Sequence, residues 1–336
     1  MAHVLDHPGS DRSGSARPTL RRRARACGAA LLVFAVGGCG GSGNAPPTVA
    51  PPGSNVIVNA YAALESDDYA ALPGVIEALD ARLEAEPDDG TIAFYAGAMH
   101  LWRLTRLRTD LQGNARQAAE DVSDTLRLLD RAHTLRPRSE HAAAFLGIAR
   151  LAISGLARDE TGIEQGRQVL RDAMPLHPAY VSGVRAIALG ALPRTHPGFA
   201  EAIEAIGENF AACGLSGSGD LGLSVTYPEG RQTSARRVCN DEGVVAHVWE
   251  GIFLTFGDVL VKGGDAARGR ALYLNARAAP GYASWTLRDL LEERIAQADE
   301  RAALYLDDNP DNDPPTWMEE DRICVGCHVR NDPPEP

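Results

Sequence analysis

Ala132-His133-Thr134-Leu135-Arg136-Pro137 is a helix-forming run that ends on a proline, and variants of it recur along the chain. The other copies are Leu83-Glu84-Ala85-Glu86-Pro87, Ala173-Met174-Pro175-Leu176-His177-Pro178 and Ala276-Arg277-Ala278-Ala279-Pro280. A proline ends a helix because it lacks an amide hydrogen and its ring clashes with the preceding turn. Gly97 and Gly147 follow Pro87 and Pro137 by ten residues, and without a side chain they let a partner helix approach closely. The recurrence predicts helices that pair and repeat along the chain.

The sequence around these motifs has the composition and periodicity of helices. Ala, Leu, Arg and Glu dominate from Asn55 to Asp307, and apolar residues recur every three or four positions, as in Val75-Ile76-Leu79-Leu83. We therefore predict an all-α fold of helical hairpins over residues 55–306.

A Gly- and Ser-rich insertion at residues 213–239 interrupts the helical pattern. It holds the strand-like alternation Leu223-Ser224-Val225-Thr226-Tyr227, and Cys213 and Cys239 bracket it. In an oxidising compartment such a pair most simply forms a disulfide. We expect a disulfide-stapled surface loop, stabilised by roughly 3 kcal/mol through loop closure.

The motif Ala-x-x-Leu-x-Pro, followed by a helix with a small residue at its eighth position, resembles tetratricopeptide repeats (TPRs). The resemblance covers roughly Asn55 to Asp307. The intervals between the motif prolines are 50, 41 and 102 residues, longer than the family's usual length of about 34, which indicates divergent repeats. The resemblance implies a TPR-like α-solenoid whose groove binds a protein or an extended ligand.

The first residues have the layout of an export signal. Four arginines precede Gly28–Val36, an apolar run that is too short to span a bilayer. The next residues, Val36-Gly37-Gly38-Cys39, resemble the lipobox of bacterial lipoproteins. That resemblance implies that residues 1–38 are cleaved and that Cys39 is acylated. A cleaved signal without acylation, or acylation of Cys27, is the alternative.

The lipobox implies a lipid-anchored protein of the cell envelope on the periplasmic face. Residues 39–54 are rich in Gly, Ser and Pro, which is typical of a flexible tether. Gly40 follows the anchor instead of the Asp that tends to hold lipoproteins at the inner membrane, so the outer membrane is favoured. No other segment approaches the length of a membrane span.

The mature sequence is strongly acidic. Removal of residues 1–38 takes away six Arg and two Asp, which leaves 27 basic and 43 acidic residues and a net charge of −16. Nucleic acid needs a basic face, so nucleic-acid binding is excluded. We interpret the many Asp and Glu residues on helices as solvated faces.

Cys324-Val325-Gly326-Cys327-His328 has the C-x-x-C-H spacing of c-type cytochromes. Two thiols at this spacing reach the two vinyl groups on one edge of a porphyrin, and the histidine lies over the iron. The resemblance implies one covalent haem c, with Cys324 and Cys327 as thioethers and His328 as an axial ligand. The opposite ligand stays open, with Met318 as one candidate. Three other readings are a redox-active dithiol, a structural disulfide and a zinc site.

The position of the motif is unusual, because only eight residues follow His328. The resemblance to cytochromes therefore covers the motif alone. We predict an acidic, proline-bearing linker at residues 307–316 and a haem attachment segment at residues 317–336. Trp317 is expected to pack on the porphyrin or on the helical body. Four other histidines are expected to be packed or on the surface instead of binding iron: His100, His141, His177 and His247.

Together these features favour a lipid-anchored, non-enzymatic electron carrier over a catalyst, with helical repeats that dock a redox partner protein. The alternative is a non-redox binding lipoprotein in which the C-x-x-C-H motif is structural or binds a metal. The lipobox, the hairpins ending at Pro137 and Pro178 and a closing helix Leu287–Leu306 resemble TPR-like lipoproteins associated with TRAP-type transporters. A third possibility is a catalytic haem, for instance peroxidatic, which requires an open sixth position.

Overall fold

The computed structural model describes residues 55–107, 113–213, 249–279, 281–307 and 309–317. All regular structure in these residues is helical, so the all-α prediction is confirmed for them. The α-helices are α1 (Val56–Glu65), α2 (Leu72–Ala85), α3 (Gly90–Leu107), α4 (Ala115–Leu135), α5 (Glu140–Ala157), α6 (Glu160–Ala173), α7 (Pro178–Gly190), α8 (Pro197–Ala212), α10 (Trp249–Lys262), α11 (Ala266–Ala278) and α12 (Arg288–Leu306). Two single turns of 3₁₀-helix, η1 (Tyr69–Ala71) and η3 (Tyr282–Ser284), complete them.

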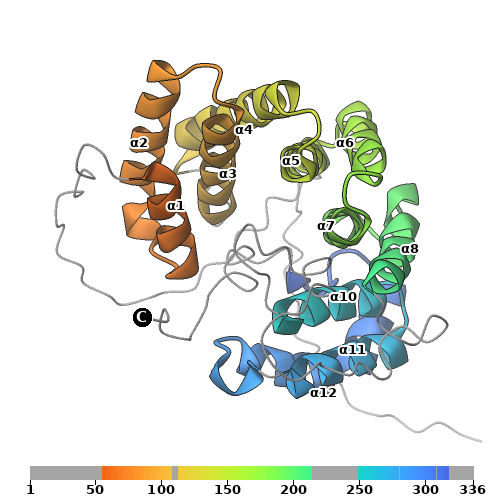
Figure 1. Cartoon of the computed structure of the whole chain (residues 1–336). Coiled ribbons are helices and arrows are strands. Elements are labelled where there is room, and N and C mark those ends of the chain that lie inside the picture. Colours follow the sequence, from red (N-terminus) through yellow and green to blue (C-terminus); the bar gives the residue numbers. More distant parts are fainter. Residues whose placement is uncertain (1–54, 108–112, 214–248, 280, 308, 318–336) are drawn as a thin grey trace, which may run out of the picture. The chain divides into compact units, whose positions relative to one another are not determined.

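The helices pack in neighbouring pairs (Figure 1). The most extensive contacts join α3 to α4, α5 to α6, α7 to α8 and α10 to α11. Helix α12 packs on α11 and α10, and α1 packs on α2. The prediction of helical hairpins is therefore confirmed for this part of the chain.

The helix ends lie where the proline motifs predict them. Helix α4 ends at Leu135, and Ser139 then starts α5 by accepting a hydrogen bond from the amide of Ala142 (3.3 Å). Pro178 is the first residue of α7, a position that needs no amide hydrogen. His177 caps the same helix, because its Nδ1 accepts from the amide of Tyr180 (3.2 Å).

The two predicted glycine contacts are also confirmed. A Cβ atom added to Gly97 would lie 2.8 Å from Cγ of Leu129 on α4. One added to Gly147 would lie 2.6 Å from Cγ of Leu170 on α6. In both hairpins the missing side chain is what lets the second helix pack at this distance.

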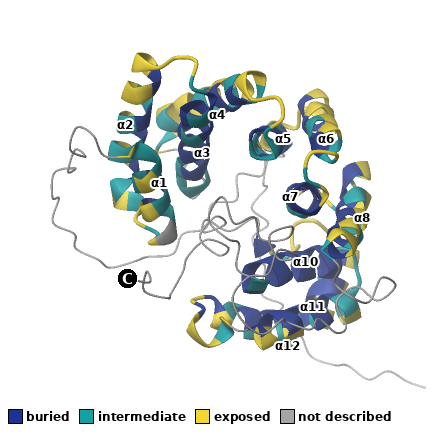
Figure 2. Cartoon of the chain, in the orientation of Figure 1, coloured by how far each residue is buried: buried dark blue, intermediate teal, exposed yellow. Residues whose placement is uncertain are grey.

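Buried side chains form two apolar clusters, one mainly from α2 to α5 and the other mainly from α5 to α12. Helix α10 is the most enclosed element, and each of its residues from Glu250 to Lys262 is buried (Figure 2). None of the described helices combines the length and the apolar composition that a membrane crossing requires.

Candidate functional site

Most of the residues with predicted chemistry lie outside the described part of the chain. This holds for the haem motif residues Cys324, Cys327 and His328, for Met318 and for the predicted acylation site Cys39. Their roles therefore stay predictions. The structure does describe the segment Pro314–Trp317, which leads directly into the haem motif, and we call it the C-terminal strap.

Only one of the two cysteines of the predicted disulfide lies among the described residues. Cys213 caps the C-terminal end of α8, whereas Cys239 and the loop between them fall outside the described residues. The disulfide therefore stays a prediction as well.

The C-terminal strap is anchored on the buried carboxylate of Asp258, near the middle of α10. Its Oδ2 accepts a hydrogen bond from the backbone amide of Trp317 (2.6 Å). Its Oδ1 accepts from the hydroxyl of Tyr273 on α11 (2.6 Å) and lies 3.3 Å from Nε of Arg294 on α12. One carboxylate thus joins three helices to the strap.

Side chains of α12 bind the strap by donating to its backbone carbonyl groups. Arg301 and Arg294 both donate to the carbonyl of Pro315, at 2.6 and 3.2 Å. The hydroxyl of Tyr305 donates to the carbonyl of Pro314. The strap is thus bound by three side chains that lie seven and four residues apart on one helix.

The indole of Trp317 belongs to the apolar cluster of α5 to α12 and is 1% exposed. Trp317 is expected to pack either on the porphyrin or on the helical body, and in the structure it packs on the helical body. The predicted linker also differs at its C-terminal end. Its described residues 307 and 309–313 are exposed, but the carbonyls of Pro314 and Pro315 are hydrogen-bonded and Thr316 is buried, because α12 supplies the donors.

The environment keeps Tyr273 protonated so that it donates to the carboxylate. Burial, and then the negative charge of Asp258, raise the pKa of the Tyr273 hydroxyl well above its usual value. Asp258 in turn accepts from the Tyr273 hydroxyl and the Trp317 amide and lies beside the Arg294 guanidinium, and these contacts offset the cost of burying a carboxylate.

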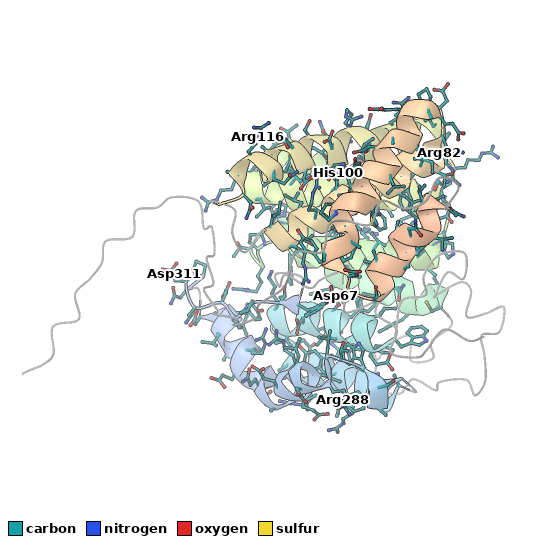
Figure 3. All side chains as sticks on the ribbon, turned by 90° about the vertical axis from the view of Figure 1, so that its left-hand side faces the viewer. Asp67, Arg82, His100, Arg116, Arg288 and Asp311 are labelled. Atoms are coloured by element: carbon teal, nitrogen blue, oxygen red, sulfur yellow. The ribbon has the colours of Figure 1, made fainter. Side chains whose placement is uncertain are left out.

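A second buried carboxylate, Asp121 on α4, forms the other polar cluster in the core. Its Oδ1 accepts from Nδ1 of His100 (2.8 Å) and from Nη2 of Arg103 (2.6 Å), both on α3. Nε2 of His100 lies 3.7 Å from Oδ2 of Asp80 on α2. Figure 3 shows His100 among the helices, whereas Arg116 is at their outer surface.

The carboxylates of Asp121 and Asp80 determine the charge of His100. Burial alone would lower the pKa of the imidazole, but hydrogen bonding and charge from Asp121 and Asp80 outweigh it and raise the pKa to about 9. The same contacts, with Arg103, lower the pKa of Asp121 against the opposing effect of burial. At neutral pH His100 and Asp121 are therefore both charged.

The other described histidines also have structural contacts. His177 caps α7, and the His141 ring packs on the Tyr180 ring with 4.6 Å between centroids. His247 is outside the described residues. Among the described residues no group of three His, Cys, Asp or Glu side chains could hold a metal ion.

Sequence reasoning missed the buried carboxylates, because it placed the acidic side chains on solvated faces. Asp121, Asp258 and Glu250 are instead buried, and burial raises the pKa of Glu250. A signal was present in each helix. Asp121 occupies a position of the apolar stripe of α4, between Ala118 and Thr125, and Asp258 interrupts the apolar run of α10.

No protein-family model matches the chain, and neither does any curated protein or any solved structure.

Proposed function

We propose that this protein is a lipid-anchored electron carrier of the bacterial cell envelope. The observation that carries the proposal is the C-x-x-C-H motif at Cys324–His328, at the far end of a chain that begins with an export signal. Covalent haem attachment takes place outside the cytoplasm, so the two features support each other.

The donor set of the motif fits a haem c. Cys324 and Cys327 supply the two thiols for thioether bonds, and His328 supplies the imidazole for the iron. When bound, the haem supplies one-electron chemistry. The helical body binds the C-terminal strap, which precedes the motif in sequence, through Asp258 and α12, and this supports a fixed attachment of the segment.

We also propose that the hairpins are TPR-like repeats that dock the redox partner. Support comes from the close glycine contacts at Gly97 and Gly147, which occupy the same place in successive hairpins. The first helices of successive hairpins also contact each other, α3 with α5, α5 with α7 and α7 with α10. Contacts of this kind are typical of helical-repeat solenoids.

The haem proposal is tested by expressing the full chain with a cytochrome c maturation system and denaturing it. We expect haem absorbance that stays with the polypeptide. Replacement of both Cys324 and Cys327 by Ser should abolish it, whereas replacement of Cys213 and Cys239 by Ser should not. A wild-type chain without covalent haem contradicts the proposal, and one equivalent of zinc in that chain would favour the metal-binding reading instead.

The anchor is tested by cell fractionation. Cys39→Ser should move the protein from the membrane fraction to the soluble fraction, because one acylated residue provides the attachment. Cys27→Ser is the matched control and should leave the protein in the membrane fraction. The opposite pattern would assign the anchor to Cys27.

A row of aromatic side chains favours the second candidate function, a binding lipoprotein. Ring contacts run from Tyr61 on α1 to Tyr95 on α3 (5.3 Å between centroids), from Phe94 on α3 to Phe145 on α5 (5.1 Å), and from His141 on α5 to Tyr180 on α7. Tyr61, Tyr95, His141 and Phe145 in this row are half-buried, whereas Phe94 and Tyr180 are buried. Half-buried aromatic rings are suited to contacts with a protein or an extended ligand. If the wild-type chain carries no covalent haem, this reading becomes the leading one.

A further inference from the structure

Two buried arginines of α12 lie beside the C-terminal strap. The guanidinium groups of Arg294 and Arg301 are both buried, and Nε of Arg294 lies 3.3 Å from Oδ1 of Asp258. Both guanidinium groups donate to the carbonyl of Pro315, Arg301 at 2.6 Å and Arg294 at 3.2 Å. Since a buried charge needs polar partners, this strap carbonyl contributes to the solvation of both arginines.

The strap sequence suits this role. Pro314 and Pro315 have no amide hydrogens, so they present carbonyl acceptors without adding donors that would need partners. Their fixed φ also reduces the conformational entropy that is lost when the segment becomes ordered. The next residue with a large side chain, Trp317, then fills the apolar cluster.

The strap limits where the haem motif can lie. Cys324 is the seventh residue after Trp317. Even when fully extended, this stretch of chain spans at most about 25 Å. Cys324 therefore stays within that distance of the buried indole, as long as the strap remains bound.

We infer that Asp258, Arg294, Arg301 and Tyr305 are positioning residues: they clamp the C-terminal strap and so fix the point on the helical body from which the haem attachment segment continues. This inference rests on the proposed function. On that function, electron exchange takes place within reach of the bound strap, and the redox partner has to approach the chain there.

The clamp is tested by hydrogen exchange on the full mature chain, with and without haem. In the wild type, the Trp317 amide should exchange on the order of 100-fold more slowly than the amides of the exposed residues 309 and 311–313. Asp258→Asn replaces the charged acceptor and should reduce that protection about tenfold or more. The matched control Tyr273→Phe removes a different hydrogen bond to the same carboxylate and should leave it within about twofold of wild type.

A distance measurement covers the case in which Asp258→Asn does not fold. In a Cys39→Ser, Cys324→Ser chain, one spin label is placed at Cys327 and a second at Ala303→Cys, on an exposed position of α12. We expect a narrow distance distribution, and about a twofold broader one after Trp317→Ala. Equal widths would overturn the inference, as would a wild-type Trp317 amide that exchanges as fast as the amides of residues 309 and 311–313.

The two proposals fail in different ways. Protection of the strap is expected in the chain without haem as well, because none of its contacts involves the motif. A protected strap in a chain that never acquires haem would contradict the proposed function alone. An unprotected strap in a chain that carries covalent haem would contradict the clamp alone.

Discussion

Asp121 and Asp258 are two carboxylates buried in one helical chain, but they join very different parts of it. Asp121 is bound by His100 and Arg103, which lie 21 and 18 residues away on the other helix of the same hairpin. Asp258 on α10 is contacted by side chains from two other helices, α11 and α12, and by the amide of Trp317, 59 residues along the chain. The first carboxylate locks a hairpin, and the second fixes a segment that lies beyond α12.

The acceptors in the two clusters differ as well. In the α2–α4 cluster, which we call the balanced cluster, His100 and Arg103 lie beside the carboxylates of Asp121 and Asp80, of which Asp80 is half-exposed. In the α10–α12 cluster, Arg294 lies beside Asp258, and both Arg294 and Arg301 donate to the backbone carbonyl of Pro315. The contacts given above for the balanced cluster stay within three helices, whereas those of the α10–α12 cluster include the C-terminal strap.

The largest effect should come from removing the carboxylate of the balanced cluster. Asp121→Ala leaves two buried cations without their shared partner, which should lower the free energy of unfolding by about 3–5 kcal/mol. Denaturant unfolding measures this value. The control is Asp124→Ala on the same helix, which breaks only an exposed pair with Arg127 and should cost less than about 1 kcal/mol. An equal fall in the free energy of unfolding for both variants would show that Asp121 stabilises the fold no more than an exposed carboxylate does.

The pH dependence of stability should reveal the charged state of His100. Its pKa is about 9 in the folded chain and 6.5 in the reference state. The shift corresponds to about 3 kcal/mol, which is fully present below about pH 6.5 and lost as the pH rises towards 9. The lowered pKa of Asp121 adds stability above its unfolded pKa of 3.8, which is lost as the pH falls below it. The cluster should therefore contribute most between about pH 4 and 6.5.

Unfolding curves measured from pH 6 to 10 test this expectation. Wild type should lose stability across the range, whereas His100→Gln should be less stable at pH 6 and nearly independent of pH above it. A wild-type profile that runs parallel to that of His100→Gln would mean that the imidazole is neutral in the folded chain.

The same comparison shows what the sequence can predict. Helix ends and glycine contacts depend on residues close together in sequence, such as Pro178 at the start of α7 or Gly97 opposite Leu129, and these predictions hold. The burial of Asp258 depends on Trp317, 59 residues away, and on donors from two other helices. Periodicity alone gives no sign of such partners, so the carboxylates were assigned to solvent and the strap to a linker.

Removing one arginine from each cluster should distinguish the balanced cluster from the α10–α12 cluster. Arg103→Met deprives Asp121 of three hydrogen bonds from one guanidinium and should cost about 3 kcal/mol. Arg301→Met should cost only about 1 kcal/mol, because Arg294 continues to donate to the carbonyl of Pro315. Denaturant unfolding of the two variants measures the difference. If Arg301→Met costs as much as Arg103→Met, Arg294 does not substitute for Arg301 at the strap.

The smallest effect should come from the hydroxyl that reaches Asp258 from α11. Tyr273→Phe removes one neutral donor but leaves the contacts of Asp258 with Arg294 and Trp317, so the free energy of unfolding should fall by about 1 kcal/mol. The strap should stay bound, since its own contacts are unchanged. Thermal unfolding and tryptic cleavage after Arg322 measure the two effects separately. A Tyr273→Phe chain that is cleaved much faster than wild type would show that the strap follows the general stability of α10–α12, which is the opposite of a dedicated clamp.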